Sequence, residues 1–328
     1  MGAALQQAEA LAAQDGGTDE VVARFRAVLD AYPDSPLVLA RYAAFADNVL
    51  ENPEEAQGYY EQALALKPTD AAAVQLLASF LANYKDDLEG AKEMYDRGLA
   101  AHPTDAVLLD SYGFFLQNVL GRTEEAMQCL SRAVECAPAN PQILSHYAAF
   151  LRSVCGDFAG AEEALMTALG ENDEDADLLF QYADLLDQCM GQSDRAIPFY
   201  ELALQADEEH LMSHNNIAAL LIEQAKDKAA GGKTEASETL FADASAHLEV
   251  VEAASPGLAS YNLACIAALR EDEAGAQQWL THGAEQGGLP KMETILQDDD
   301  IKFARRLPFF QDLMLRLQSD EAEAAAAQ

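Results

Sequence analysis

The chain has 328 residues, with 20 Lys and Arg against 56 Asp and Glu, and its net charge at pH 7 is −36. Because proteins bind nucleic acid and anionic membranes through Lys and Arg, this charge argues against both as partners and favours basic proteins or peptides. The alternative is that the acidic residues only keep the protein soluble. Apolar residues form 50% of the chain, a composition that excludes a disordered protein.

The five cysteines and the N-terminal residues indicate the compartment. No two cysteines form a Cys-x-x-Cys pair, and an odd number would leave one unpaired in a secreted protein. The N-terminal stretch lacks the basic start and the long apolar core of a signal peptide. No apolar run approaches the roughly 20 residues that a membrane-spanning helix needs. We therefore expect a cytoplasmic protein.

A period of 35 residues runs along most of the chain. Large apolar residues recur at one position of this period, small residues at a second position and prolines at a third. The three series are Tyr42, Leu77, Tyr112, Tyr147, Tyr182 and Ile217; Ala56, Ala91, Ala126, Ala161 and Ala196; and Pro33, Pro68, Pro103 and Pro138. A fixed period in this range is typical of a solenoid, in which each repeat buries its apolar face only against its neighbours.

Each repeat is predicted to contain two helices, as residues 70–105 illustrate. Asp70 precedes an apolar stretch and can cap the first helix, which carries an apolar stripe at 77–81. A polar turn at 85–87 separates it from a second helix, and Pro103 ends the repeat. The capping position is held in other repeats by Ser35, Asp105, Asn140 and Asp175.

The repeat resembles the tetratricopeptide repeat, a helix–turn–helix unit with small residues at its eighth and twentieth positions and a bulky residue at its twenty-fourth. Ala43, Ala56 and Tyr60 hold these positions in the second repeat. The resemblance is strongest over 36–210, where one extra residue in the turn gives a period of 35 instead of about 34. It implies an all-α fold, a right-handed α-solenoid of about eight helix–turn–helix repeats.

The sequence after residue 225 departs from the strict period. An insertion over 226–237 interrupts the seventh repeat and displaces the helix that follows, and we expect its stretch 231–234 to form a flexible loop. Residues 298–310 resemble the module that often ends bacterial-type arrays of this family. The matching residues are Asp298, Asp300, Ile301, Ala304, Arg305, Pro308 and Phe310. The residues expected to cover the open face of the last repeat are Phe303, Phe309, Phe310, Leu313 and Leu315.

These observations predict three regions: a solenoid over 1–288, a capping module over 289–318 and an acidic, Ala-rich tail over 319–328. The expected repeats within the solenoid are 1–35, 36–70, 71–105, 106–140, 141–175, 176–210, 211–256 and 257–288. The first repeat keeps the register only weakly, through Val21 and Phe25.

Patterns that would indicate an enzyme are weak in this chain. Gly231–Thr234 reads GGKT, but Asp227 stands where a phosphate-binding loop needs its first glycine, and no strand precedes it. His210 and His214 have the spacing of a helical metal pair, but no third ligand of fixed spacing follows, and His210 lies in the capping phase. No nucleophile with a placed base is recognisable. We expect no enzyme activity, no cofactor and no metal site.

In the resembled family the first helices line a concave groove, which implies a binding surface here. The residues carried over to this groove are Asp110, Phe114, Arg152, Asp177, Phe180, Asp184, Asp187 and Asn215. Four carboxylates, two aromatic rings and one Arg predict a groove that binds a basic or amphipathic protein segment through apolar anchors and charge steering. The alternative is an ordinary solvated face, with the rings half-buried between repeats.

Asn48, Asn83 and Asn118 follow the same period near the ends of first helices. An asparagine in this place can grip the backbone of a ligand. It can also bond the local backbone or the next repeat, and the two readings both stay open.

A repeat array of this kind favours a non-catalytic adaptor or scaffold for protein–protein interaction. The alternative is a structural subunit that assembles a larger complex through its convex face or the array ends. A co-chaperone is less favoured, because family members that bind acidic chaperone tails use Lys and Arg on first helices. Arg41 and Arg152 are the only such residues on the first helices of repeats two to six, apart from Lys85 at a helix end. The oligomeric state stays open.

Overall fold

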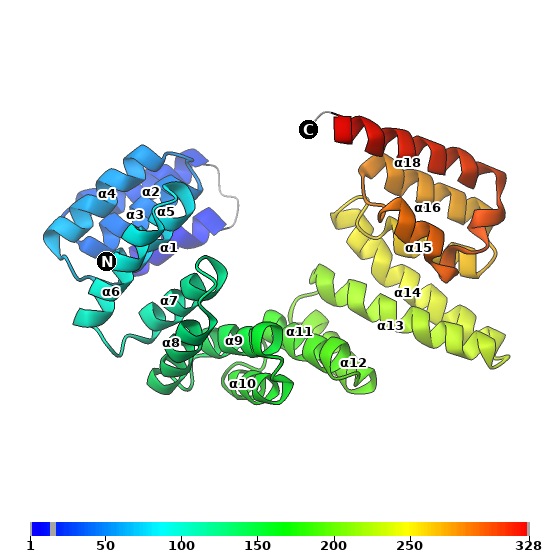
Figure 1. The fold of residues 1–328 in the computed structure, drawn as a ribbon, viewed down its shortest axis with the longest axis horizontal. Helices are drawn as coiled ribbons and strands as arrows, with labels where there is room; N and C mark the ends of the chain where they lie inside the picture. Colours follow the sequence, from blue (N-terminus) through cyan, green and yellow to red (C-terminus); the bar gives the residue numbers. More distant parts are fainter. Residues whose placement is uncertain (1, 14–17, 327–328) are drawn as a thin grey trace. The chain divides into compact units, whose positions relative to one another are not determined.

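The computed structural model describes residues 2–13 and 18–326. The chain forms two compact parts, an N-terminal part (Met1–Glu171) and a C-terminal part (Asn172–Gln328). Within the described ranges each part consists of helices and turns and contains no strand (Figure 1). The sequence-based prediction of an all-α repeat fold is therefore confirmed.

The N-terminal part contains five pairs of antiparallel helices. Their bounds are α1 Gly2–Ala13, α2 Thr18–Ala31, α3 Pro36–Asn48, α4 Pro53–Leu66, α5 Ala71–Tyr84, α6 Leu88–Ala101, α7 Ala106–Asn118, α8 Thr123–Cys136, α9 Pro141–Phe150 and α10 Phe158–Glu171. A π-helical turn, Leu151–Cys155, continues α9. From α3 onward both the first and the second helices begin at intervals of 35 residues, as the sequence predicts.

The C-terminal part begins with the same helix pair and then becomes less regular. Its helices are α11 Ala176–Asp184, α12 Ser193–Ala206, α13 Leu211–Ala230, α14 Thr234–Ala254, α15 Ser260–Leu269, α16 Glu273–Gln286, α17 Met292–Gln297 and α18 Pro308–Ala326. A π-helical turn, Leu185–Cys189, continues α11, and two short 3₁₀ turns, Asp299–Ile301 and Ala304–Arg306, lie between α17 and α18. Over the described residues, no helix has both the length and the apolar character to cross a bilayer.

Local capping explains why the first helices begin where they do. The side chains of Asp70 and Asp105 accept hydrogen bonds from the backbone N–H three residues later, at 3.2 and 3.0 Å. The predicted caps Ser35, Asn140 and Asp175 make the same kind of bond. Each cap satisfies a donor that the first helical turn leaves free, typically worth about 1 kcal/mol.

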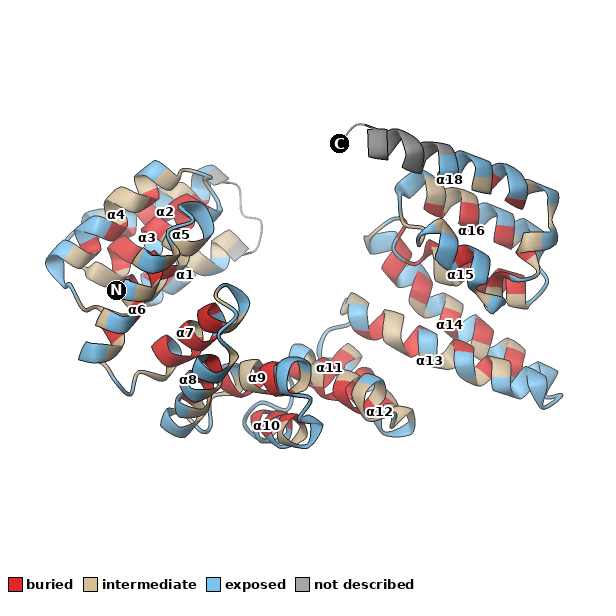
Figure 2. Ribbon diagram, in the orientation of Figure 1, coloured by how far each residue is buried: buried red, intermediate tan, exposed pale blue. Residues whose placement is uncertain are grey.

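Small residues allow the paired helices to approach closely. Ala43 on α3 and Ala56 on α4 are fully buried, as are their equivalents in later pairs, and the buried residues gather between paired helices (Figure 2). Gly113 on α7 shows how tight this contact is, because a Cβ atom there would lie 2.7 Å from Leu130 Cγ on α8. A larger side chain in this series would push the helices apart.

Most of the insertion at 226–237 is helical, and the loop expected at 231–234 is a turn of three residues. The helices α13 and α14 extend through the insertion as an antiparallel pair, and only Gly231–Lys233 form the turn. Ser237 and Ala225 are buried, and the Ser237 hydroxyl donates to the Ala225 carbonyl at 2.9 Å. The Ala, Lys and Glu residues on either side of the glycines are strong helix formers, which explains the helical structure.

The segment after α16 packs against α15 and α16. Ile301, Ala304, Phe310 and Leu313 are buried in one cluster with residues of these two helices. Leu315 is 65% exposed, so the expectation that it helps to cover this face was wrong. Two positions along a helix turn a side chain by about 200°, which directs Leu315 away from the side that buries Leu313.

Two further predictions for this segment concern the burial of Phe303 and Phe309 and the acidic tail. Phe303 and Phe309 are partly buried against the same cluster, as expected. The predicted acidic tail continues α18 as a helix to Ala326, and residues 327–328 lie outside the described residues.

Candidate functional site

The helices α5, α7 and α9 contact one another in order in the N-terminal part, and they are the first helices of three consecutive repeats. On α7, Asp110 and Phe114 lie one turn apart on the same face. The stripe that packs into the core is made of Leu108, Leu109, Tyr112, Gly113, Phe115 and Leu116. Phe114 falls outside this stripe, and it is 59% exposed.

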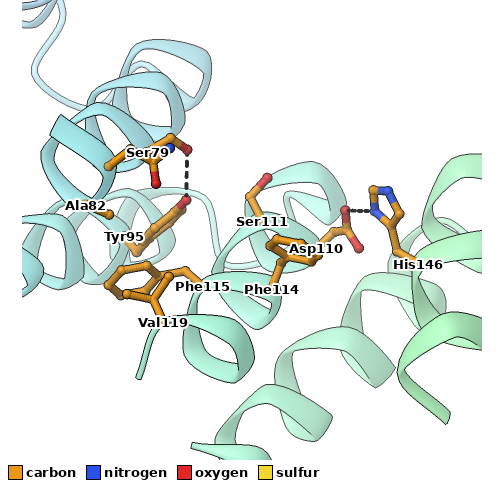
Figure 3. A pocket seen from close by; sticks show the side chains of 10 residues that line it. Ser79, Ala82, Tyr95, Asp110, Ser111, Phe114, Phe115, Val119 and His146 are labelled. Carbon is orange, nitrogen blue, oxygen red and sulfur yellow. Dashed lines mark hydrogen bonds and ion pairs between the residues drawn. The ribbon is translucent and has the colours of Figure 1, made fainter. Parts of the chain in front are cut away.

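Two hollows flank the Phe114 ring. The larger has a volume of about 290 Å³, and its lining residues are Ser79, Ala82, Asn83, Tyr95, Asp110, Ser111, Phe114, Phe115, Val119 and His146 (Figure 3). The smaller has a volume of about 120 Å³, and its lining residues are Gln117, Asn118, Leu130, Ala149, Phe150, Ser153 and Val154, together with Phe114 and His146. Because Phe114 and His146 line both, they form the ridge between the two hollows.

Asp110 and His146 form an ion pair at the side of this ridge (Figure 3). His146 Nδ1 lies 2.8 Å from Asp110 Oδ2, and His146 Nε2 lies 2.7 Å from the Gln142 amide nitrogen. The hydrogen bond with Asp110 raises the pKa of His146, although burial works in the opposite direction. The protonated imidazole is therefore stabilised beside the carboxylate.

The other carboxylate oxygen of Asp110, Oδ1, differs from Oδ2 in its hydrogen bonding. Asp110 is 7% exposed, and its Oδ1 atom is buried with no hydrogen-bond donor among the described residues. A buried carboxylate oxygen without a donor is costly in a low-dielectric site. Asp110, which lines the larger hollow, therefore carries an unused acceptor that is covered by neighbouring atoms.

The structure brings several of the predicted residues to these hollows. Asp110, Phe114 and Asn83 line the larger hollow, and Asn118 lines the smaller one. Arg152 lies in the π-helical turn after α9 and is half-buried. Asn48 is exposed at the end of α3, away from the residues that line either hollow.

The remaining predicted residues belong to the C-terminal part. Asp177 and Asp184 lie on α11, where Asp177 pairs with His210 at 3.3 Å and Asp184 accepts from Asn216 at 3.4 Å. Phe180, on the same helix, is 8% exposed. It packs against His210 and Tyr200, which makes it a core residue of this part and not an exposed anchor.

Asp187 and Asn215 also use their side chains within the C-terminal part. Asp187 Oδ1 accepts a hydrogen bond from Ser193 at 2.6 Å. Asn215 Oδ1 accepts from Asn262 on α15 at 3.3 Å. These contacts hold neighbouring helices together.

His146 was missed by the sequence analysis, although a signal for it exists. Asp110 and His146 are 36 residues apart, one more than the period, and they meet across α7 and α9. Gln75 and Ser111 have the same separation, and the Gln75 amide donates to the Ser111 hydroxyl at 2.9 Å. A search for complementary polar residues at a spacing of 36 would have found both pairs.

The histidines with the spacing of a metal pair have separate partners. His210 caps α13 through Nδ1, which accepts from the Ser213 backbone at 3.2 Å. His214 Nδ1 instead lies 2.7 Å from His247 Nδ1 on α14. Among the described residues, no group of three or more His, Cys, Asp or Glu side chains is placed to hold a metal ion.

No family model matches the sequence, and no curated protein matches it either. Among solved structures, yeast Tom70 aligns with 94% of this chain and 62% of its own length, at a TM-score of 0.55 and 18% identity. The chain has the tetratricopeptide-repeat fold. This identification rests on the Tom70 likeness together with the helix pairs that recur every 35 residues.

Two shorter structures also resemble this chain. PilF of Pseudomonas aeruginosa aligns with 64% of the chain and 90% of its own length, at a TM-score of 0.49 and 21% identity. YrrB, described as a TPR protein with an unusual peptide-binding site, aligns with 58% of the chain and 95% of its own length, at a TM-score of 0.40 and 19% identity. Likenesses at these values carry no argument about function.

Proposed function

We propose that this protein is a non-catalytic adaptor that binds a basic or amphipathic protein segment on α5, α7 and α9. The observation that supports it most is the Phe114 side chain, which is 59% exposed on the ridge between two hollows. An exposed aromatic ring contributes strongly to binding when a partner buries it, because it covers a large area and loses little rotational freedom.

The sizes of the two hollows favour side chains of a protein segment as occupants. At about 290 and 120 Å³, they lie at and below the lower end of the roughly 300–1,000 Å³ that is common for small-molecule and cofactor sites. An extended segment could place one side chain on each side of Phe114. In this proposal the protein uses no cofactor and catalyses no reaction.

Charge supports a basic or amphipathic partner. The chain carries −36, which attracts basic segments over a distance and repels nucleic acid and anionic membranes. We also propose that this protein is cytoplasmic, and that residues 289–318 cap the repeat array. Asn83 and Asn118 lie where they can bond the backbone of a bound segment.

A structural subunit is the second candidate, and one surface favours it. Leu315 on α18 and Leu296 on α17 are 65% and 44% exposed. They border a hollow of about 540 Å³, whose other lining residues are Met292, Arg305, Phe310, Gln311, Met314 and Gln318. Exposed leucines around a hollow are typical of a contact surface in an assembly.

The two candidates can be separated by affinity capture from native lysate with identification by mass spectrometry. Wild type is compared with Phe114→Ala, with Leu315→Ala, and with Met166→Ala as a control for the loss of an exposed apolar side chain. Met166 lies on α10 and is 56% exposed. Salt is varied in each case, because charge steering weakens as ionic strength rises.

Partners that are lost from Phe114→Ala, retained by Met166→Ala and weakened by salt would support the adaptor. Partners lost only from Leu315→Ala would favour the structural subunit. Partners retained by Phe114→Ala would contradict the proposed site.

A further inference from the structure

The larger hollow beside Phe114 contains features that fit one particular kind of side chain. Its wall includes Asp110, which is only 7% exposed. Asp110 Oδ2 accepts from His146 at 2.8 Å, whereas Oδ1 has no donor within the described chain. A ligand that brings an N–H donor to Oδ1 removes the cost of leaving this oxygen unpaired.

Aromatic rings form much of the remaining wall. The exposed ring of Phe114 and the buried rings of Tyr95 and Phe115 line the same hollow (Figure 3). The face of an aromatic ring attracts a cation that lies within about 6 Å of its centre. Rings beside a carboxylate therefore form a site for a positively charged group.

Apart from His146, the polar side chains at the hollow each include an oxygen that can accept a hydrogen bond from a cation with several donors. Asn83 and Ser111 line the hollow, and the Ser111 hydroxyl already accepts from Gln75 at 2.9 Å. Ser79 and Tyr95 place their hydroxyl oxygens 3.5 Å apart in the same wall. None of the described residues that line the hollow is Lys or Arg, and His146, which can carry a positive charge, bonds Asp110 through Oδ2 and not through Oδ1.

Arginine fits these features better than lysine. A guanidinium is planar, stacks on an aromatic face and carries five N–H donors, so it can lie on the Phe114 ring and still reach a carboxylate. An ammonium is a compact, strongly hydrated point charge that gains less from a ring. The hollow of about 290 Å³ suits one long side chain.

We propose that this hollow is a subsite for one arginine side chain of a bound protein segment, an inference that rests on the adaptor function proposed above. The guanidinium stacks on Phe114 and donates to Asp110 Oδ1, while His146 keeps its bond to Oδ2. Because Oδ1 is covered, the side chains around it shift slightly when the donor enters. The smaller hollow, with Leu130, Phe150 and Val154 in its wall, takes a neighbouring apolar side chain.

The test uses two fluorescein-labelled peptides of equal charge, one of six arginines and one of six lysines, and measures fluorescence anisotropy with the full chain. Three variants are compared with wild type: Asp110→Asn, Phe114→Leu and Glu93→Gln. The last is a charge-matched control. Glu93 is exposed on α6, and its substitution removes one negative charge, as Asp110→Asn does. Circular dichroism during heating establishes that each variant is folded at the temperature of the binding measurement.

We expect the arginine peptide to bind wild type at least about fivefold more tightly than the lysine peptide. Asp110→Asn should weaken the arginine peptide about tenfold, as the loss of a charge-assisted hydrogen bond does. Phe114→Leu, which replaces an exposed ring with another apolar side chain, should remove the preference for arginine. Glu93→Gln should change either affinity by less than about twofold.

Two results would overturn the inference in different ways. If both peptides bind wild type equally and Asp110→Asn behaves like Glu93→Gln, the arginine subsite is wrong and the adaptor function stands. If neither peptide binds wild type, the subsite and the basic partner of the proposed function both fail.

Discussion

The N-terminal and C-terminal parts are built from the same helix pair, but different interactions join their helices. In the N-terminal part, aromatic rings of one repeat pack against rings of the next, as Tyr95 on α6 does with Tyr112 and Phe115 on α7 at centroid distances of 5.0 and 5.5 Å. In the C-terminal part, buried polar groups add to the apolar clusters where the period is lost. Glu252 accepts from the backbone N–H groups of Gly257 and Ala259 at 2.6 and 3.0 Å.

The difference follows from the sequence period. Where every repeat has 35 residues, the same kind of contact recurs between each repeat and the next, and apolar side chains provide most of the stacking. Beyond residue 225 the helix lengths vary, so the contacts of the 35-residue repeats no longer recur. Specific polar contacts, such as the bond between Lys226 on α13 and Asp300, then hold the elements together.

The largest expected effect tests the apolar contacts between repeats of the N-terminal part. Tyr95→Ala removes a ring that is 2% exposed and leaves a cavity, and it should lower the free energy of unfolding by about 3–5 kcal/mol. Hydrogen exchange should show the loss in the N-terminal part alone. Tyr84→Ala, which removes a ring that is 50% exposed, is the control and should cost less than about 1 kcal/mol. Equal loss of protection in both parts would show that they unfold as one.

A substitution of Glu252 tests the buried polar contacts of the C-terminal part. Beyond the two backbone donors, the Ser260 hydroxyl and His282 lie 2.9 and 3.0 Å from its carboxylate. Glu252→Gln places an amide N–H₂ against these donors and should lower the free energy of unfolding by about 2–3 kcal/mol, as measured by urea denaturation. Glu249→Gln, an exposed change on the same helix, should have little effect.

The pH dependence of Glu252 has a definite sign. Burial alone would raise its pKa, but the hydrogen bonds from Gly257, Ser260 and Ala259 together with His282 hold it below its ordinary value. The stabilisation is therefore complete above about pH 4.3 and is lost as the pH falls through the lowered pKa. Glu252→Gln should flatten this part of the stability profile, and an unchanged acid profile would contradict the assignment.

Lys226 should have a smaller effect, because it is partly exposed. Its ammonium group lies 2.8 Å from both Asp300 Oδ1 and Glu223 Oε1, and its side chain is 32% exposed. Lys226→Met should lower the free energy of unfolding by about 1 kcal/mol, with the loss of hydrogen-exchange protection centred on residues 298–310. Lys228→Met is the matched control on α13. An equal effect of both variants would mean that helix propensity, not the bond to Asp300, matters here.

The smallest expected effect comes from His214 and His247. Their Nδ1 atoms are 2.7 Å apart, and His214 Nε2 lies 3.0 Å from the Glu208 carbonyl, so His247 Nδ1–H donates to His214 when both rings are neutral. Burial and the neighbouring His214 lower the pKa of His247. Stability should therefore fall as the pH drops below about 6.5.

The change should be of the order of 1 kcal/mol between pH 7 and pH 5. His247→Gln keeps a donor to His214 but does not titrate, so its stability should vary less over this range. Thermal unfolding at several pH values measures the difference. A variant with the pH profile of wild type would show that other groups control this range.

Much of the fold could be predicted because its signals are local. The caps Asp70 and Asp105 act on a backbone group three residues away, and the small residues recur at one fixed position. The insertion at 226–237 was predicted only in part, because its two glycines indicate a loop but do not indicate that the residues on either side continue two helices. The glycines form only the turn, and the helix formers around them determine the rest.

The candidate site was predictable only in part. Asp110 and Phe180 hold equivalent positions 70 residues apart, and both were assigned to a groove, yet both are buried at 7% and 8% exposure. Phe114, four residues after Asp110, is the exposed one. The sequence could assign all three to first helices, but not decide which of them faces the neighbouring helix.

The sequence by itself determined where the helices begin, that they pair, and that they repeat every 35 residues, because caps, apolar stripes and small residues act within one repeat. Only the tertiary structure decided which side chains remain exposed. It placed His146 beside Asp110 and left Phe114 on a ridge between two hollows. The reason is that these contacts join different repeats, and their geometry depends on how successive helix pairs stack, which a period alone does not specify.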